Sequence, residues 1–123
     1  MVIDSSVFIE FLRAKNKKNT TLYAISSETQ LFISSVTLYE LLMGATNKAK
    51  TDDINLITGD LTILDFDKRT AVKAAQIYHK LRTENRMIEF RDIFIAATCI
   101  ANKLPVKTLN KKHFSRIEDL LIA

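Results

Sequence analysis

The sequence has few of the residues that interrupt or cross-link a chain. Among 123 residues there are two glycines, one proline, one cysteine and no tryptophan. Two glycines are too few for a glycine-rich phosphate loop or for the fingerprint of a dinucleotide-binding fold. The single cysteine, Cys99, excludes a disulfide framework and a cluster of thiolate metal ligands, and it favours a reducing compartment. Any chemistry must therefore come from carboxylates, hydroxyls and basic side chains.

Long apolar runs are also missing. No stretch approaches the roughly 20 apolar residues that a membrane span requires, and the opening Met-Val-Ile-Asp has neither a basic leader nor an apolar signal segment. We therefore expect a cytoplasmic protein with no membrane partner. The composition is 47% hydrophobic and 26% charged, which is ordinary for a globular protein. The length suits one domain with a real core, over residues 1–123.

The balance of charge is basic, with a formal net charge of +4. This total is a weak indication of an anionic partner, and the distribution is more informative. One cluster lies near the N-terminus and another near the C-terminus: Arg13, Lys15, Lys17 and Lys18, then Lys103, Lys107, Lys111, Lys112 and Arg116. Solvated loops are the simpler interpretation of either cluster alone, and binding of a nucleic acid is the alternative.

Hydrophobic periodicity predicts short apolar strands that alternate with helices. We expect strands at 2–3, 31–34, 61–64, 105–109 and 120–122. We expect helices after Ser5-Ser6 and at 20–28, 38–45, 51–57, 68–83 and 93–101, with a loop at 15–19. The strands are continuous apolar runs rather than alternating ones, which is typical of a parallel sheet covered on both faces. The pattern predicts a three-layer α/β/α domain with a parallel, roughly five-stranded sheet.

Three acids stand apart from the surface charges because their neighbours are apolar. Asp4 ends the first strand, Glu40 interrupts an apolar helix start, and Asp92 precedes an apolar run of nine residues without a charge. A helix cap or a surface acid is the simpler interpretation of each one alone. Brought together, three carboxylates would repel one another and resist ionisation. A hard divalent cation such as Mg²⁺ or Mn²⁺ would resolve this conflict.

Four segments in chain order carry these acids or follow the last of them. They are MVIDSSVFIEFLR (1–13), ISSVTLYEL (33–41), RDIFIAA (91–97) and PVKTLNKKHFSRI (105–117). Together the segments resemble the motifs of PIN-domain ribonucleases, and the last resembles the closing motif of VapC-type toxins of type II toxin–antitoxin systems. The resemblance extends over nearly the whole chain. It implies a PIN-like α/β fold.

The resemblance also implies a function and a set of site residues. Asp4, Glu40 and Asp92 would bind Mg²⁺ or Mn²⁺ and catalyse the cleavage of single-stranded or loop RNA by metal-activated water. The motif positions next to the metal, its water or the phosphate are occupied by Ser6, Thr108 and Asn110. The loops around the cleft would contact RNA through basic residues, namely Arg13, Lys15, Lys107, Lys111 and Lys112. The implied partners are a tRNA, rRNA or mRNA loop, a VapB-like antitoxin and a second copy of the chain.

One position departs from the family pattern. Many members carry a fourth acid in the closing motif where this chain has His113. A neutral imidazole is a poor substitute for a carboxylate on Mg²⁺, which prefers oxygen ligands, so we expect one firmly held ion rather than two. His113 could contact a phosphate or transfer a proton, although a surface histidine is the simpler interpretation.

Other α/β acid sites fit less well. A dehalogenase-like phosphatase requires a second acid two residues after the nucleophilic aspartate, where this chain has Ser6. A response-regulator receiver requires an acidic pair after the first strand, and Asp4 has no acidic neighbour. The remaining alternative is of another class: a PIN-like module that binds RNA or a protein without cleavage. Retention of all three acids favours the nuclease.

Overall fold

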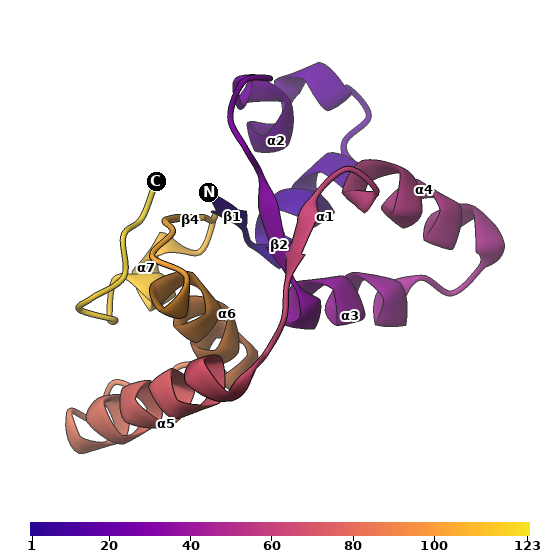
Figure 1. The fold of residues 1–123 in the computed structure, drawn as a ribbon. Coiled ribbons are helices and arrows are strands. Elements are labelled where there is room, and N and C mark those ends of the chain that lie inside the picture. The colour runs from indigo at the N-terminus through magenta and orange to yellow at the C-terminus, as the bar shows by residue number, and fades with distance from the viewer.

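The computed structural model describes residues 1–123 and has a four-stranded, all-parallel sheet at its centre (Figure 1). The strands follow the order β3-β2-β1-β4; their bounds are β1 (Val2–Ile3), β2 (Phe32–Ser34), β3 (Thr62–Leu64) and β4 (Val106–Lys107). Val2 pairs with Phe32 on one side and with Val106 on the other. The chain therefore moves outward from β1 to β3 and then crosses to the opposite side of β1. Ligands of open parallel sheets bind at the carboxyl ends of strands where the order reverses, which here is the end of β1.

Helices connect the strands and cover the sheet. In chain order they are α1 (Ser5–Arg13), the 3₁₀ turn η1 (Lys17–Asn19), α2 (Thr21–Ala24), α3 (Ser35–Gly44), α4 (Lys48–Thr58), α5 (Lys68–Thr83), α6 (Phe90–Ala101) and α7 (Lys111–Phe114). None of them is long and apolar enough to cross a membrane. Helices α1, α2, α3 and α4 lie on one side of the sheet in Figure 1, and α5 and α6 lie on the other.

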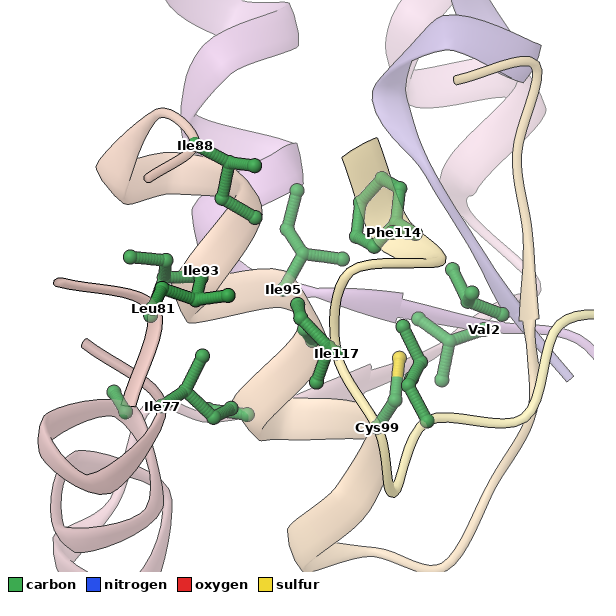
Figure 2. Packing of buried hydrophobic residues seen from close by; sticks show 14 residues of the cluster. Val2, Ile77, Leu81, Ile88, Ile93, Ile95, Cys99, Phe114 and Ile117 are labelled. Carbon is green, nitrogen blue, oxygen red and sulfur yellow. The ribbon is translucent and has the colours of Figure 1, made fainter. Parts of the chain in front are cut away.

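Two hydrophobic clusters confirm the three-layer arrangement. Successive strand residues point to opposite faces, and Val2 packs in one cluster while Ile3 packs in the other. The larger cluster joins α5, α6, α7 and the C-terminal segment, and Figure 2 shows its side chains packed around α6. The smaller cluster joins β1 and β2 to α1, α3 and α4. The predicted fold class is therefore confirmed.

Helix α6 is the central helix that the apolar run predicted. Seven of its twelve residues are buried, among them Asp92 and Cys99. Burial raises the pKa of the Cys99 thiol to about 12, so this side chain is an inert part of the core. The helix begins at Phe90, and the turn after α5 contains Asn85 in the left-handed conformation (φ 54°).

Several predicted boundaries are wrong for local reasons. Helix α3 begins at Ser35 rather than Leu38, because the Ser34 hydroxyl accepts a hydrogen bond from the Thr37 amide and caps the helix. Asn47 caps α4 in the same way and moves its start from residue 51 to 48. The predicted helix 20–28 ends at Ala24, and residues 17–19 of the predicted loop form η1.

The sheet is also smaller than predicted. The strand expected at 105–109 is limited to 106–107, and the fifth strand expected at 120–122 is reduced to one bridge between Val106 and Ile122. Thr108 lies directly after the strand, and its hydroxyl donates a hydrogen bond to Asp4. The edge of the sheet beyond β4 is therefore mostly irregular chain.

Candidate active site

Asp4 lies where β1 ends and α1 begins, and it is only 2% exposed. Its Oδ2 accepts hydrogen bonds from Ser6 Oγ at 2.7 Å and from Thr108 Oγ1 at 2.8 Å. Ser5 Oγ donates a longer bond of 3.4 Å to Oδ1. All of these donors are neutral hydroxyls, so the charge of this buried carboxylate is oriented but not neutralised.

Hydrogen bonds connect the turn after β4 to the start of α1. Thr108 Oγ1 accepts from the Asn110 amide at 2.9 Å, and the Leu109 amide donates to Ser6 Oγ at 3.0 Å. The Leu109–Ser6 bond and the Thr108–Asp4 bond each connect residues more than 100 positions apart in the chain, and together they fix the orientation of Asp4. Ser6 and Thr108 therefore lie where we predicted supporting residues, and each contacts Asp4 directly.

Asp92 enters the same site from the first turn of α6 and is 8% exposed. Its pKa is raised, first by burial and then by the charge of Asp4, while His113 acts in the opposite direction. His113 Nδ1 lies 3.6 Å from Asp92 Oδ2 and 2.8 Å from Asn110 Nδ2, which donates to it. His113 therefore forms part of the wall of the site, although its side chain is still 37% exposed.

Glu40 projects from α3, and its side chain is 13% exposed. Burial raises the pKa of Glu40, the Arg91 guanidinium opposes this shift, and the charges of Asp4 and Asp92 add to it. Arg91 Nη1 lies 3.3 Å from Glu40 Oε2. The other oxygen, Oε1, is buried and accepts no hydrogen bond. An unsatisfied buried carboxylate oxygen is costly, and a bound cation would satisfy it.

The three acids share one open pocket of about 240 Å³. Its lining consists almost entirely of polar residues: Asp4, Ser5, Ser6, Ile9, Glu40, Glu89, Arg91, Asp92, Asn110 and His113. Thr108 is 1% exposed and supports the pocket from behind Asp4. Most of the residues selected from the sequence as ligands or supporting groups are therefore brought together at the carboxyl end of β1.

The basic residues that we predicted to bind RNA do not line this pocket. Arg13 borders a neighbouring, half-apolar pocket of about 320 Å³ that shares Ile9 and Glu40 with it. Lys111 and Lys112 are exposed at the start of α7, beside His113, and Lys15 is exposed in the turn after α1. Lys107 is half-buried in β4. These residues can contact only a ligand larger than the pocket itself.

Sequence analysis missed four residues that line the pocket: Ser5, Ile9, Glu89 and Arg91. The last two form an ion pair. Arg91 Nη2 lies 2.7 Å from Glu89 Oε2, so its guanidinium spans Glu89 and Glu40. Glu89 and Arg91 both precede Asp92 closely in the sequence and resemble an ordinary pair of surface charges. One signal was present: a cation in the first turn of a helix is disfavoured by the helix dipole, so an arginine there calls for a compensating partner.

The donor set fits a hard divalent cation. Carboxylate and hydroxyl oxygens are the ligands that Mg²⁺ and Mn²⁺ prefer. No three His, Cys, Asp or Glu side chains lie close enough together to hold a metal ion by themselves, so an ion in this pocket would need water among its ligands, as Mg²⁺ usually has in proteins. The buried free oxygen of Glu40 and the uncompensated charge of Asp4 both favour such an ion.

Comparison with known proteins identifies the family. The PIN domain model matches residues 1–120. The chain therefore belongs to the PIN-domain family. Within the family, it is 31% identical over 128 residues to Ribonuclease VapC of Rickettsia bellii, with 98% of this chain and 92% of that protein covered. It is 26% identical over 119 residues to Ribonuclease VapC1 of Methanocaldococcus jannaschii, covering 97% and 82%.

Solved structures have the same fold. The chain superposes on the structure of VapBC2 from Rickettsia felis bound to a promoter DNA fragment with a TM-score of 0.86 at 21% identity, covering 99% of this chain and 96% of that one. The structure of DNA-bound VapBC from Salmonella typhimurium gives a TM-score of 0.82 at 26% identity, with coverage of 99% and 95%. The resemblance that the four motifs indicated is confirmed.

Proposed function

We propose that this protein is a divalent-metal-dependent endoribonuclease and the toxin of a VapBC-type toxin–antitoxin pair. The observation that carries the proposal is that Asp4, Glu40 and Asp92 line the same pocket at the carboxyl end of β1. A surface that only binds RNA has no use for three clustered carboxylates facing an anionic ligand. The names of the relatives support the same activity.

Each residue of the site has its own role in the proposed reaction. Asp4, Glu40 and Asp92 would hold Mg²⁺ or Mn²⁺ together with water, and Ser6 and Thr108 orient Asp4 through their hydroxyls. When bound, the ion supplies Lewis-acid catalysis and lowers the pKa of the attacking water. Asn110 holds His113 at the edge of the pocket, where the imidazole can donate a hydrogen bond to a phosphate oxygen.

The substrate is RNA in a single-stranded or loop conformation, since its backbone can bend into the pocket more readily than that of a rigid duplex. The exposed cations Arg13, Lys15, Lys111 and Lys112 attract its backbone, with Lys107 beside them. Their contribution is electrostatic, so binding should weaken as salt concentration rises. The cytoplasm is the compartment that contains such RNA, and a single buried thiol suits it.

A VapB-like antitoxin is the proposed protein partner. The solved neighbours include complexes named VapBC from Rickettsia felis and Salmonella typhimurium. A segment of the antitoxin that carries an arginine or lysine would cover the acidic pocket and neutralise its carboxylates. The second proposed partner is another copy of this chain.

Sequencing of RNA 5′ ends tests the function and identifies the substrate together. RNA from cells that express the wild-type protein should contain new 5′ ends, and RNA from cells that express Asp4→Asn should not. The exposed acid Asp52, which pairs with Lys48 on α4, offers a matched control, and Asp52→Asn should behave as wild type. If wild-type protein gives no new ends and purified protein cleaves no cellular RNA with Mg²⁺ or Mn²⁺, the non-cleaving binding module is correct instead.

A further inference from the structure

We propose that Arg91 is a positioning residue that holds Glu40 in the orientation required for cation binding. The inference rests on the proposed metal site. Arg91 comes from α6 and Glu40 from α3, and their ion pair crosses the pocket that lies between the two helices. It occupies one oxygen of Glu40 and leaves the buried Oε1 without a partner.

The environment of Arg91 argues for a dedicated role. It is the second residue of α6, next to Asp92, where the positive end of the helix dipole disfavours a cation. Two carboxylates compensate for this position: Glu40 at 3.3 Å and Glu89, the residue before the helix, at 2.7 Å. A cation that lies at the unfavourable end of a helix dipole and is stabilised by two carboxylates from different elements is typical of a functional site.

Glu89 anchors the other side of the guanidinium. The Glu89 side chain is 61% exposed and that of Arg91 is 54% exposed, so their pair lies at the mouth of the pocket, while Glu40 is inside it. Glu89 thus restrains Arg91, and Arg91 restrains Glu40. Residues that hydrogen-bond to a metal ligand and fix its orientation commonly change metal affinity by 10–100-fold when they are replaced.

Positioning and simple electrostatics predict opposite outcomes. If Arg91 contributed only its charge, Arg91→Gln would remove a positive charge from an acidic pocket and strengthen cation binding. If Arg91 positions Glu40, the same change frees the carboxylate to turn away and weakens binding. The direction of the change in affinity therefore decides between the two roles without any measurement of RNA cleavage.

The experiment is calorimetric titration of metal-free protein with Mn²⁺ alone. We expect Arg91→Gln to lower the affinity by about tenfold, and Arg91→Lys to restore only part of it, because an ammonium cannot span two carboxylates as the guanidinium fork does. Arg69→Gln is the matched control. Arg69 is also the second residue of its helix and pairs with the acid two residues before it, Asp67, but lies outside the pocket.

A double-mutant cycle separates positioning by Glu89 from direct ligation. We expect Glu89→Gln to weaken Mn²⁺ binding in the wild-type background and to have little further effect in Arg91→Gln. An equal effect in both backgrounds would make Glu89 a ligand in its own right and overturn the proposed chain of contacts. Thermal unfolding in EDTA identifies any folding defect. If Arg91→Gln is unstable, Arg91→Lys carries the test, because it keeps the charge and should weaken Mn²⁺ binding only if the guanidinium positions Glu40.

Unchanged or tighter Mn²⁺ binding by Arg91→Gln would overturn the inference and leave the proposed nuclease intact. Absence of Mn²⁺ binding and of RNA cleavage in the wild-type protein would instead overturn the proposed function. The two failures are therefore distinguishable.

Discussion

The charge of Asp4 acts on the other two acids of the pocket. It is one cause of the raised pKa values of Asp92 and Glu40. We therefore expect Asp4→Asn to lower both pKa values towards those of ordinary carboxyl groups. NMR titration of the side-chain carboxyl carbons in EDTA measures this directly. Unchanged values in Asp4→Asn would contradict the electrostatic coupling, and Asp52→Asn should leave both pKa values as they are.

The raised pKa of Asp92 also predicts how stability depends on pH in the absence of metal. A carboxyl group whose pKa is higher in the folded protein favours folding in its protonated form. This contribution is complete below the ordinary pKa of 3.8 and is lost as the pH rises through the raised value. Urea unfolding at several pH values in EDTA should show a larger loss in wild type than in Asp92→Asn, because Glu40, whose pKa is also raised, contributes a loss of the same sign in both proteins. The contribution of Asp67 to stability depends on pH in the opposite direction, because hydrogen bonds from Thr70 lower its pKa. Asp67 is present in both proteins, so its contribution cancels when they are compared.

A bound cation should reverse the destabilisation at neutral pH. A ligand that binds only the folded state at 100 times its Kd adds about 2.7 kcal/mol to the free energy of unfolding. We expect this increase for wild type in Mn²⁺ and little of it for Asp4→Asn. Equal stabilisation of both proteins, measured by urea unfolding at pH 7, would place the ion at another site.

At the residue scale, the acids could be predicted from the sequence because they interrupt apolar segments. Asp4, Glu40 and Asp92 have hydrophobic neighbours, so each had to be either paired or functional. Glu89 and Arg91 could not be predicted, because they are exposed, adjacent and opposite in charge, which describes most surface pairs. Their roles depend on the contact with Glu40, which is 51 positions before Arg91 in the chain, and no local pattern reports that contact.

Helix α6 is the element that connects the core to the site. Ile95 is completely buried one turn after Asp92 and packs in the larger cluster. We expect Ile95→Ala to lower the free energy of unfolding by about 3 kcal/mol, because it leaves a cavity that the neighbouring side chains cannot fill. Denaturant unfolding checks this value. Leu56→Ala on α4, at a position that is 81% exposed, should change stability by less than about 0.5 kcal/mol, and an equal loss in both variants would contradict the central position of α6.

At the scale of elements, order and type could be predicted, but ends could not. Runs such as 31–34 and 93–101 are apolar because both faces are covered, so their existence was apparent from composition. The starts of α3 and α4 were misplaced because several hydroxyl or amide residues could serve as caps, and only the geometry selects Ser34 and Asn47. The strand expected at 105–109 was too long because the sequence does not show that Thr108 turns towards Asp4.

At the scale of the whole molecule, one face beside the pocket exposes apolar side chains. Tyr39 and Met43 of α3 are 64% and 62% exposed, and Phe66 packs edge-on against Phe94 of α6 beside them. This face suits the predicted homodimer. Light scattering during size-exclusion chromatography should give twice the 14.0 kDa mass of one chain, and Met43→Glu should shift the mass towards the monomer. A mass of 14.0 kDa at every wild-type concentration would contradict the dimer.

The pairing of β1 with β4 has a consequence for the order of synthesis. Asp4 and Glu40 are made early, but the residues that orient Asp4 and complete the pocket wall, Thr108, Asn110 and His113, are translated near the end. A nascent chain that stops before Pro105 lacks the strand beside Val2 and cannot assemble the acidic pocket. A partly synthesised chain therefore cannot cleave cellular RNA, because the strand that completes the pocket is not yet present. This protection does not require a protein partner.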